Sequence, residues 1–306
     1  MNVKTLLLVG SMIFMSCKNT NKELVDKPEN PQSIIINSDC PDYLLKRKKE
    51  NLNISVFVDL SNRIENKTQR FNDSAYIYSL SKVFNTHIKR KKLGLLYDKM
   101  EFFFDPTPSN QEINALTEEL KISYQKGVSK SEWMPKTLNL YSTNPSKIYN
   151  LAIQDGKDIG YPGSDIWGFM KSHAKDYCVE ECRRNILVIL TDGYMYHKSS
   201  IRQNENRTSF LTPKSLDKLG LNKNSWKDTF EQKDLGFIPA SKGLEDLEIL
   251  VLGITNENPR NSYSNDIIEA YWEKWFLEMG IKTFKIKTAD IPARIEQIIA
   301  DFILNN

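Results

Sequence analysis

Carboxylate and hydroxyl residues follow two apolar runs of this 306-residue chain, in an arrangement that could bind a cation. The run ISVFV ends in Asp59-Leu-Ser61, and the run NILVIL ends in Thr191-Asp192. Neither motif contains a histidine or a cysteine, so the donors on offer are hard oxygen atoms. Such donors suit Mg²⁺ or a similar divalent cation. Metal binding is therefore the chemistry that these residues predict.

A third segment, GYPGSD, offers a further hydroxyl and carboxylate at Ser164 and Asp165. In an open parallel sheet, ligands bind outside the carboxyl ends of the strands, where the strand order reverses. If the two apolar runs are neighbouring strands at that point, Asp59 and Asp192 face one crevice. The start of a helix at GSD would then carry Ser164 and Asp165 beside them. The predicted metal ligands are therefore Asp59, Ser61, Ser164 and Asp192.

The elements that must position these residues alternate between strand-like and helix-like patterns. Apolar runs predict strands at 54–58, 99–104, 185–190, 247–254 and 283–286. Amphipathic patterns predict helices at 73–89 with Asn72 or Asp73 as N-cap, at 110–124, 145–153, 164–178 and 266–279, and after Asp290. Gly280 is the expected stop of the helix at 266–279. The alternation predicts an α/β fold with a doubly wound, mostly parallel central sheet and helices on both faces.

In these motifs the chain resembles the von Willebrand factor type A domain, which has a Rossmann-like fold. That family carries a metal-ion-dependent adhesion site made of D-x-S-x-S after the first strand, a threonine on a later loop and an aspartate after the fourth strand. Asp59, Ser61 and Asp192 match these positions, and Ser164 replaces the threonine. The resemblance implies Mg²⁺ or a similar divalent cation whose coordination is completed by an acidic group of a protein or peptide partner.

The resemblance covers about residues 53–306, and we expect one domain over 48–306. Two long segments, at about 105–161 and 194–245, are expected to be insertions into it. Long loops over a switch point usually carry recognition. We therefore expect both insertions to shape partner specificity, and the aromatic residues of the second predict that it is at least partly ordered.

Arg63 departs from the family pattern, because it stands where the family has a second coordinating serine. A guanidinium stays charged at every accessible pH and would repel a divalent ion close by. Two alternatives follow. Arg63 turns outward and leaves a weaker metal site, or it turns inward and pairs with Asp59 or Asp192 as a fixed counter-ion that makes the metal unnecessary. Arg63, Asp165 and Thr191 are assigned to ligand binding in either case.

The N-terminus predicts export. Residues 1–16 carry Lys4 and an apolar run too short to span a bilayer, as expected of a signal peptide. The ending FMSC resembles the lipobox of bacterial lipoproteins, which implies lipidation of Cys17 and a membrane anchor in the bacterial cell envelope. The alternative is a secreted chain cleaved nearby. Residues 17–47 are polar and contain three prolines, so they predict a tether.

The formal net charge of +3 provides no electrostatic case for nucleic acid as a partner. The basic runs at 46–49 and 89–92 are interpreted as solvated ends of elements, although the first lies near the tether and could touch anionic headgroups. Besides Cys17, the cysteines are Cys40, Cys178 and Cys182. An oxidising compartment permits a disulfide, and Cys178 and Cys182 have helical spacing at the upper end of the bridging range.

The function predicted from these observations is that of a membrane-anchored lipoprotein that binds a protein or peptide at a strand-end crevice, and not that of an enzyme. Two alternatives stay open. One is a metal-dependent hydrolase of the phosphatase kind, which commonly wants a second aspartate where this chain has Ser61. The other is a structural subunit of an envelope complex, whose crevice residues only cap helices and strand ends.

Overall fold

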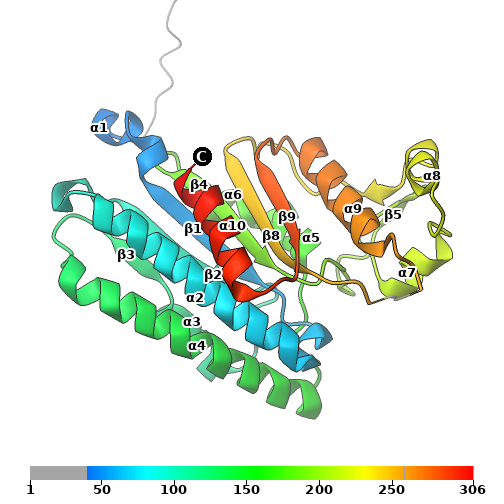
Figure 1. Cartoon of the computed structure of the whole chain (residues 1–306), viewed down its shortest axis with the longest axis horizontal. Coiled ribbons are helices and arrows are strands. Elements are labelled where there is room, and N and C mark those ends of the chain that lie inside the picture. Colours follow the sequence, from blue (N-terminus) through cyan, green and yellow to red (C-terminus); the bar gives the residue numbers. More distant parts are fainter. Residues whose placement is uncertain (1–39, 258–259, 306) are drawn as a thin grey trace, which may run out of the picture. The chain divides into compact units, whose positions relative to one another are not determined.

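A six-stranded sheet forms the centre of the fold (Figure 1). Its strands are β1 (Leu52–Val58), β2 (Asp98–Phe103), β3 (Ile122–Tyr124), β4 (Arg184–Leu190), β8 (Leu247–Ile254) and β9 (Phe284–Thr288). They lie in the order β3-β2-β1-β4-β8-β9, with β3 antiparallel to β2 and all other pairs parallel. The structure is a computed structural model that describes residues 40–257 and 260–305.

Helices cover both faces of this sheet, which confirms the predicted fold class. One face carries α2 (Lys67–Arg90), α3 (Gln111–Glu119), α4 (Lys130–Asp158) and α10 (Pro292–Leu304), and the other carries α5 (Ile166–Ser172), α6 (Ala174–Cys178) and α9 (Ser264–Glu278). Alternate residues of β1 enter two separate cores: Val56 packs under α2, and Phe57 packs under α5. A strand covered on both sides needs an unbroken apolar run, and for this reason the central strands are easy to recognise in the sequence.

The segment at about 105–161 contains regular structure that the sequence patterns had missed. A helix was expected at 110–124, but α3 ends at Glu119 and the chain turns into the antiparallel edge strand β3. The sequence pattern predicts a short helix that starts at Pro145, whereas α4 begins at Lys130 and continues through Pro135 and Pro145. Tertiary packing against α2 and α3 outweighs the local cost of these prolines.

Two other helix boundaries differ from the prediction. The helix α2 begins at Lys67 with Asn66 as its cap, so Asp73 lies inside the helix and is fully buried. The helix expected at 164–178 is divided at His173 into α5 and α6. The C-terminal stop of α9 at Gly280 is confirmed, since this glycine has a φ of 86°, in the left-handed region.

Residues 194–245 are ordered and form a small subdomain beside α9 (Figure 1). It contains β5 (Gln203–Asn204), β6 (Arg207–Thr208), β7 (Gly236–Phe237), α7 (Pro213–Lys218) and α8 (Trp226–Gln232). Trp226, Phe230 and Phe237 are buried in the core that also contains α9. The aromatic residues therefore order this segment, as the sequence predicts.

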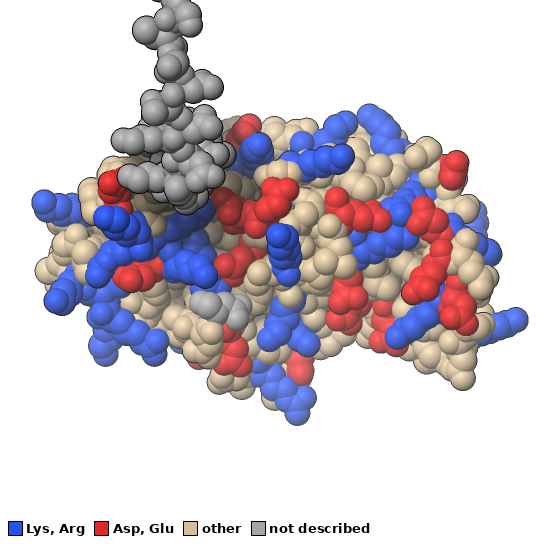
Figure 2. All heavy atoms as spheres, turned by 90° about the horizontal axis from the view of Figure 1, so that it is seen from above, with Lys and Arg blue, Asp and Glu red and all other residues tan. Residues whose placement is uncertain are grey.

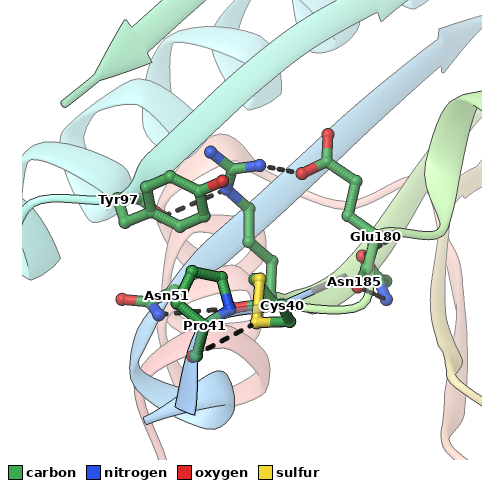
Figure 3. Close-up of a disulfide and its surroundings, with 8 residues drawn as sticks. Cys40, Pro41, Asn51, Tyr97, Glu180 and Asn185 are labelled. Carbon is green, nitrogen blue, oxygen red and sulfur yellow. Dashed lines mark hydrogen bonds and ion pairs between the residues drawn. A yellow bond between two sulfur atoms is a disulfide. The ribbon is translucent and has the colours of Figure 1, made fainter. Parts of the chain in front are cut away.

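The described part of the predicted tether is attached to the domain by a disulfide. Cys40 is bonded to Cys182, with 5.5 Å between the two Cα atoms, whereas Cys178 is free and buried. The pairing of Cys178 with Cys182, which the spacing had allowed, is therefore not formed. Figure 3 shows Asn51 beside this disulfide, and the Asn51 amide donates to the carbonyl oxygen of Cys182 at 3.2 Å.

The remaining short elements at this end are α1 (Asp42–Leu45), the 3-10 turns Lys48–Glu50 and Leu93–Leu95, and, at the other end of α2, the turn Asn62–Glu65. The predicted signal peptide, the lipidation of Cys17 and the tether up to residue 39 lie outside the described residues. Within the part of the chain that the structure describes, none of the helices combines the length and the apolar character needed to span a bilayer.

Loss of the disulfide should destabilise the domain. The bond closes a loop with a sequence separation of 142 residues, and the chain-entropy model assigns about 4–5 kcal/mol to loops of this order. We expect Cys40→Ser to lower the melting temperature by several degrees. The double variant Cys40→Ser/Cys182→Ser should melt at the same temperature as the single variant. A further large drop in the double variant, or a melting temperature of Cys40→Ser that reductant still lowers, would contradict the pairing.

Candidate functional site

The carboxyl ends of β1 and β4 meet at the point where the strand order reverses. The two strands pair in parallel with Val58 opposite Leu190, and the amide of Asp59 donates to the carbonyl oxygen of Leu190 at 3.0 Å. Chain connections leave β1 toward β2 on one side, while β4 lies on the other. The motifs DLS and TD therefore stand side by side at the switch point of the sheet, where such folds bind ligands.

A cavity of about 450 Å³ opens at this point. The four residues predicted as metal ligands, namely Asp59, Ser61, Ser164 and Asp192, all line it. Its other lining residues are Asn62, Ile166, Tyr194, Tyr196, Leu211, Thr212, Pro213, Lys214 and Glu257. Oxygen donors from three separate loops are thus brought to one small space, as the sequence predicts.

The Asp59 carboxylate is held by two hydrogen bonds from its surroundings. Its Oδ1 accepts from the amide of Ser61 at 2.9 Å, and its Oδ2 accepts from the hydroxyl of Thr191 at 3.0 Å. The Thr191 Oγ1 in turn accepts from the amide of Gly193 at 3.1 Å. Thr191 is completely buried and is not among the cavity-lining residues of the described structure. It orients Asp59, and direct contact of Thr191 with a ligand stays a prediction.

Gly193 is required by the tight turn that follows Asp192. Its φ is 95°, a conformation that residues with a side chain rarely adopt. A Cβ at this position would also lie 2.6 Å from side-chain atoms of Ile254 and Ile268. The glycine of the TDG motif therefore lets the loop pack onto the core while Asp192 stays at the cavity.

Ser164 is placed by backbone contacts on both sides. The amide of Gly163 donates to the carbonyl oxygen of Leu60 at 3.3 Å, and the amide of Asp165 donates to that of Asp105 at 2.6 Å. The Ser164 hydroxyl oxygen is buried and has no hydrogen-bond partner among the described residues. A buried hydroxyl without a partner is costly, so this atom points to a ligand that the protein alone does not supply.

The side-chain partners of Asp165 are not the four cavity residues. Its Oδ1 accepts from the amide of Gly168 at 2.8 Å and so caps α5, and its Oδ2 lies 3.4 Å from Nδ1 of His197. The Ser199 hydroxyl also donates to this oxygen at 3.3 Å. The structure therefore assigns Asp165 to the start of α5 and the neighbouring loop, and its role in ligand binding stays a prediction.

Arg63 turns inward and forms an ion pair with Asp59, as the second alternative predicts, but its closest partner is Asp73, which neither alternative names. Its Nη2 donates to Oδ2 of Asp73 at 2.7 Å and to the carbonyl oxygen of Leu190 at 3.0 Å. Its Nε donates to the carbonyl oxygen of Asp59 at 3.0 Å and lies 3.5 Å from the Asp59 Oδ2. Arg63 is thus not among the cavity-lining residues of the described structure, although it forms an ion pair with Asp59, one of the four oxygen donors.

Asp73 is the main partner of the Arg63 guanidinium. Besides Arg63, it accepts from the Tyr149 hydroxyl at 2.9 Å and from the Gln69 amide at 3.3 Å. Burial by itself would lower the pKa of Arg63, and the carboxylates of Asp73 and Asp59 outweigh it and raise that pKa above its ordinary value. One guanidinium therefore serves Asp73 first, and the two carboxylates at the cavity keep an excess of negative charge.

Asp192 has a raised pKa, first because it is buried and second because of the charge of Asp59. Its Oδ1 accepts from the amide of Tyr194 at 3.0 Å, yet burial raises the pKa of Asp192 to about 7, with a further contribution from the charge of Asp59. Arg63 opposes the rise without cancelling it. The site therefore favours either a proton on Asp192 or an added cation.

The residues present fit a divalent cation. Two carboxylates and two hydroxyls, one of them without a partner, form the kind of oxygen donor set that Mg²⁺ accepts together with water. In the described part of the chain, no group of three or more His, Cys, Asp or Glu side chains could hold a metal ion. A cation here would accordingly depend on Ser61 and Ser164 as well as on Asp59 and Asp192.

Sequence reasoning missed Glu257, which lines the same cavity. Glu257 follows β8, the next parallel strand beyond β4, and the carboxyl end of β8 lies at the same edge of the sheet as those of β1 and β4. An acidic residue shortly after a predicted strand was therefore the sequence signal that could have identified Glu257. Tyr194, Tyr196 and Lys214 also line the cavity, and they come from the segment 194–245 that was expected to shape specificity.

Removal of the Arg63 charge should destabilise the fold strongly. We expect Arg63→Met to lower the free energy of unfolding by about 3–5 kcal/mol, because it leaves Asp73 buried without its cation. Arg63→Met/Asp73→Asn should regain part of this loss. The exposed pair of Arg294 with Asp290 provides a control, since Arg294→Met should change stability far less than Arg63→Met. Urea denaturation measures all three; equal losses in the single and double variants would disprove the pairing.

The raised pKa of Asp192 predicts a pH-dependent stability. The folded state favours the protonated acid, so this contribution is present at acid pH and is lost as the pH rises through about 7. Asp192→Asn has no proton to lose, so it should melt above the wild type at about pH 8 and much closer to it at about pH 5. Asp228→Asn, at an exposed position of α8, should show no such difference. A constant offset for Asp192→Asn at both pH values would contradict the shift.

Comparisons with protein-family models, with curated proteins and with solved structures found no match to this chain. The function of the site is therefore inferred from its own chemistry and position in the fold.

Proposed function

We propose that this protein is an exported, lipid-anchored relative of the von Willebrand factor type A domains, which binds a protein or peptide through a divalent cation at the strand-end cavity. Asp59, Ser61, Ser164 and Asp192 hold Mg²⁺ or a similar ion. The ion supplies an open coordination position for a carboxylate of the partner. The observation that carries this proposal is the convergence of these four residues on one cavity, with the buried Ser164 hydroxyl left without a protein partner.

The strand order supports the family assignment. The sheet order, with its reversal between β1 and β4 and its antiparallel edge strand, provides a doubly wound frame with both acidic motifs at the switch point. The positive charge of Arg63 is a smaller objection to a cation at this site than the sequence suggests. The guanidinium is bound to Asp73 and to the carbonyl oxygens of Asp59 and Leu190.

The residues that line the cavity support a protein or peptide ligand. One wall is made by residues of the segment 194–245, including Tyr196 and Lys214, and Glu257 lies at the cavity as well. Lys214 offers a positive charge to an acidic partner beyond the metal itself, and Tyr196 is 57% exposed. Such a mixture of an exposed aromatic side chain and a few charged groups is suited to recognition of a side chain or short segment of another protein.

The disulfide supports the proposed location. Bonds of this kind form and persist in exported proteins and are rare in the reducing cytosol. Cys40 and Cys182 are joined in the folded domain, which agrees with secretion directed by residues 1–16 and anchoring at Cys17. We place the protein in the bacterial cell envelope on these grounds.

Metal binding is tested by thermal melting with Mg²⁺, Mn²⁺ or a chelator. A cation at a hundred times its dissociation constant should stabilise the wild type by about 2.7 kcal/mol. Ser164→Ala and Asp192→Asn should reduce or abolish this gain, because each removes a ligand oxygen or its charge. Asp228→Asn should keep it. Absence of any cation-dependent gain in the wild type would rule out the metal-dependent form of the proposal.

Partner binding is tested by selecting peptides from a displayed library in the presence of Mg²⁺. Selected peptides should be enriched in Asp or Glu, and a chelator should release them. Replacement of residues 196–214 by a short linker should abolish peptide binding while the cation-dependent gain in stability persists. Peptides that remain bound in the chelator, or that still bind after the replacement, would contradict the proposed role of the cavity.

A further inference from the structure

A second cavity lies at the opposite end of the sheet, where β1 and β4 begin. Its volume is about 420 Å³. Its lining residues are Arg47, Lys49, Glu50, Leu52, His87, Arg90, Lys91, Lys92, Leu95, Arg184, Ile303 and Leu304. The two basic runs, 46–49 and 89–92, are far apart in the chain, and the fold brings them to the same hollow. Figure 2 views the domain from this end and shows Lys and Arg atoms gathered over one area of the surface.

Two of these cations are already neutralised by the fold. Lys91 donates to Oδ2 of Asp98 at 2.6 Å, and Arg184 donates to both carboxylate oxygens of Glu248 at 2.8 and 2.6 Å. Arg184 also donates to the carbonyl oxygens at the end of α10. These two residues build the floor of the hollow, and their charge is not available to a ligand.

Three other cations remain available. Lys49, Arg90 and Lys92 are exposed, and among the described residues none of the three side chains has a hydrogen-bond or ion-pair partner. Arg47 is exposed as well and has one loose ion pair with Glu50, at 3.6 Å. Several unpaired cations around one hollow attract an anion, and guanidinium and ammonium groups together suit the oxygens of a phosphate group.

Exposed apolar side chains flank the same basic runs. Leu45, 40% exposed, directly precedes the first run, and Leu93, 58% exposed, directly follows the second. Tyr43, 67% exposed, lies in α1 beside them in the chain. A soluble phosphate compound would gain nothing from these side chains. The boundary between headgroups and acyl chains would take them up while the cations meet the phosphates.

The chain enters the described domain at this end. Cys40 is the first described residue, and the Cys40–Cys182 disulfide holds it there. Asn51 connects that disulfide to the basic hollow, because it donates to the carbonyl oxygen of Cys182 and accepts from Lys91 at 3.0 Å. The segment that would lead from a lipidated Cys17 therefore reaches the domain next to the unpaired cations.

We infer that this end of the domain docks on an anionic membrane surface, with the phosphate group of a lipid headgroup in the hollow formed by the two basic runs. Docking of this end directs the strand-end cavity away from the bilayer, because the two sites lie at opposite ends of the parallel strands. The inference extends the proposed anchoring at Cys17, yet it concerns separate residues and predicts membrane binding without the acyl group.

Vesicle sedimentation tests the docking surface with a chain that begins at Lys18, which lacks the predicted signal peptide and Cys17 but retains every described residue. We expect this chain to bind phosphatidylcholine vesicles that contain phosphatidylglycerol and to leave vesicles of phosphatidylcholine alone in solution. Added salt should weaken binding. The variant Lys49→Gln/Arg90→Gln/Lys92→Gln should bind the anionic vesicles at least about tenfold more weakly, and Leu93→Ser should also reduce binding.

A matched control carries the same loss of charge elsewhere. Lys218→Gln/Lys223→Gln/Lys242→Gln changes three exposed lysines of the segment 194–245 and should bind anionic vesicles like the wild type. Equal binding to both vesicle types, or equal loss in the two triple variants, would overturn the inference. Binding of inorganic phosphate without binding of anionic vesicles would show that the phosphate group in the hollow does not come from a lipid headgroup, and would overturn the inference. The cation-dependent gain in stability should be unchanged in the first triple variant, so failure at one site is separable from failure at the other.

Discussion

The ion pair between Arg63 and Asp73 is the contact on which the crevice end of the fold depends. Asp73 is fully buried inside α2, and Arg63 follows β1, so the pair joins a helix to a strand end. The same guanidinium binds the carbonyl oxygen of Asp59, which follows β1, and that of Leu190, the last residue of β4. A permanent cation thus adds hydrogen bonds to backbone acceptors at the strand ends, where the loops must be rigid enough to present oxygen donors.

This use of Arg63 sets the electrostatics of the cavity above it. If the guanidinium had paired only with Asp59 or Asp192, the site would have been nearly neutral and would have had little reason to attract a metal ion. Because Asp73 takes the shortest contact, the cavity carboxylates retain negative charge. Burial raises the pKa of Asp192, and the charge of Asp59 adds to this rise. The arginine that stands in place of a coordinating serine is therefore compatible with the proposed cation site.

The two ends of the sheet are chemically opposite. The carboxyl ends of the strands gather hydroxyls and carboxylates, and the amino ends gather unpaired lysine and arginine side chains with exposed apolar residues. The disulfide lies at the basic end and connects the first described residue to the loop before β4. This polarity matches a domain that faces a membrane with one end and a partner with the other, so the proposed functions need no rearrangement of the fold.

Local sequence patterns were sufficient for the central strands and for the four oxygen donors, because doubly covered strands require apolar runs and their polar ends must meet at one edge of the sheet. They failed for β3, which is too short to show a period, and for α4, where Pro145 suggests a helix start that packing overrides. The partner of Arg63 could not be deduced either, since Asp73 has the residue type of a helix cap and becomes a buried counter-ion only when α2 crosses β1. The sequence by itself determined which candidate residues the strand ends bring together; the tertiary structure decided which charges cancel, because that depends on distances between residues that the chain does not connect locally.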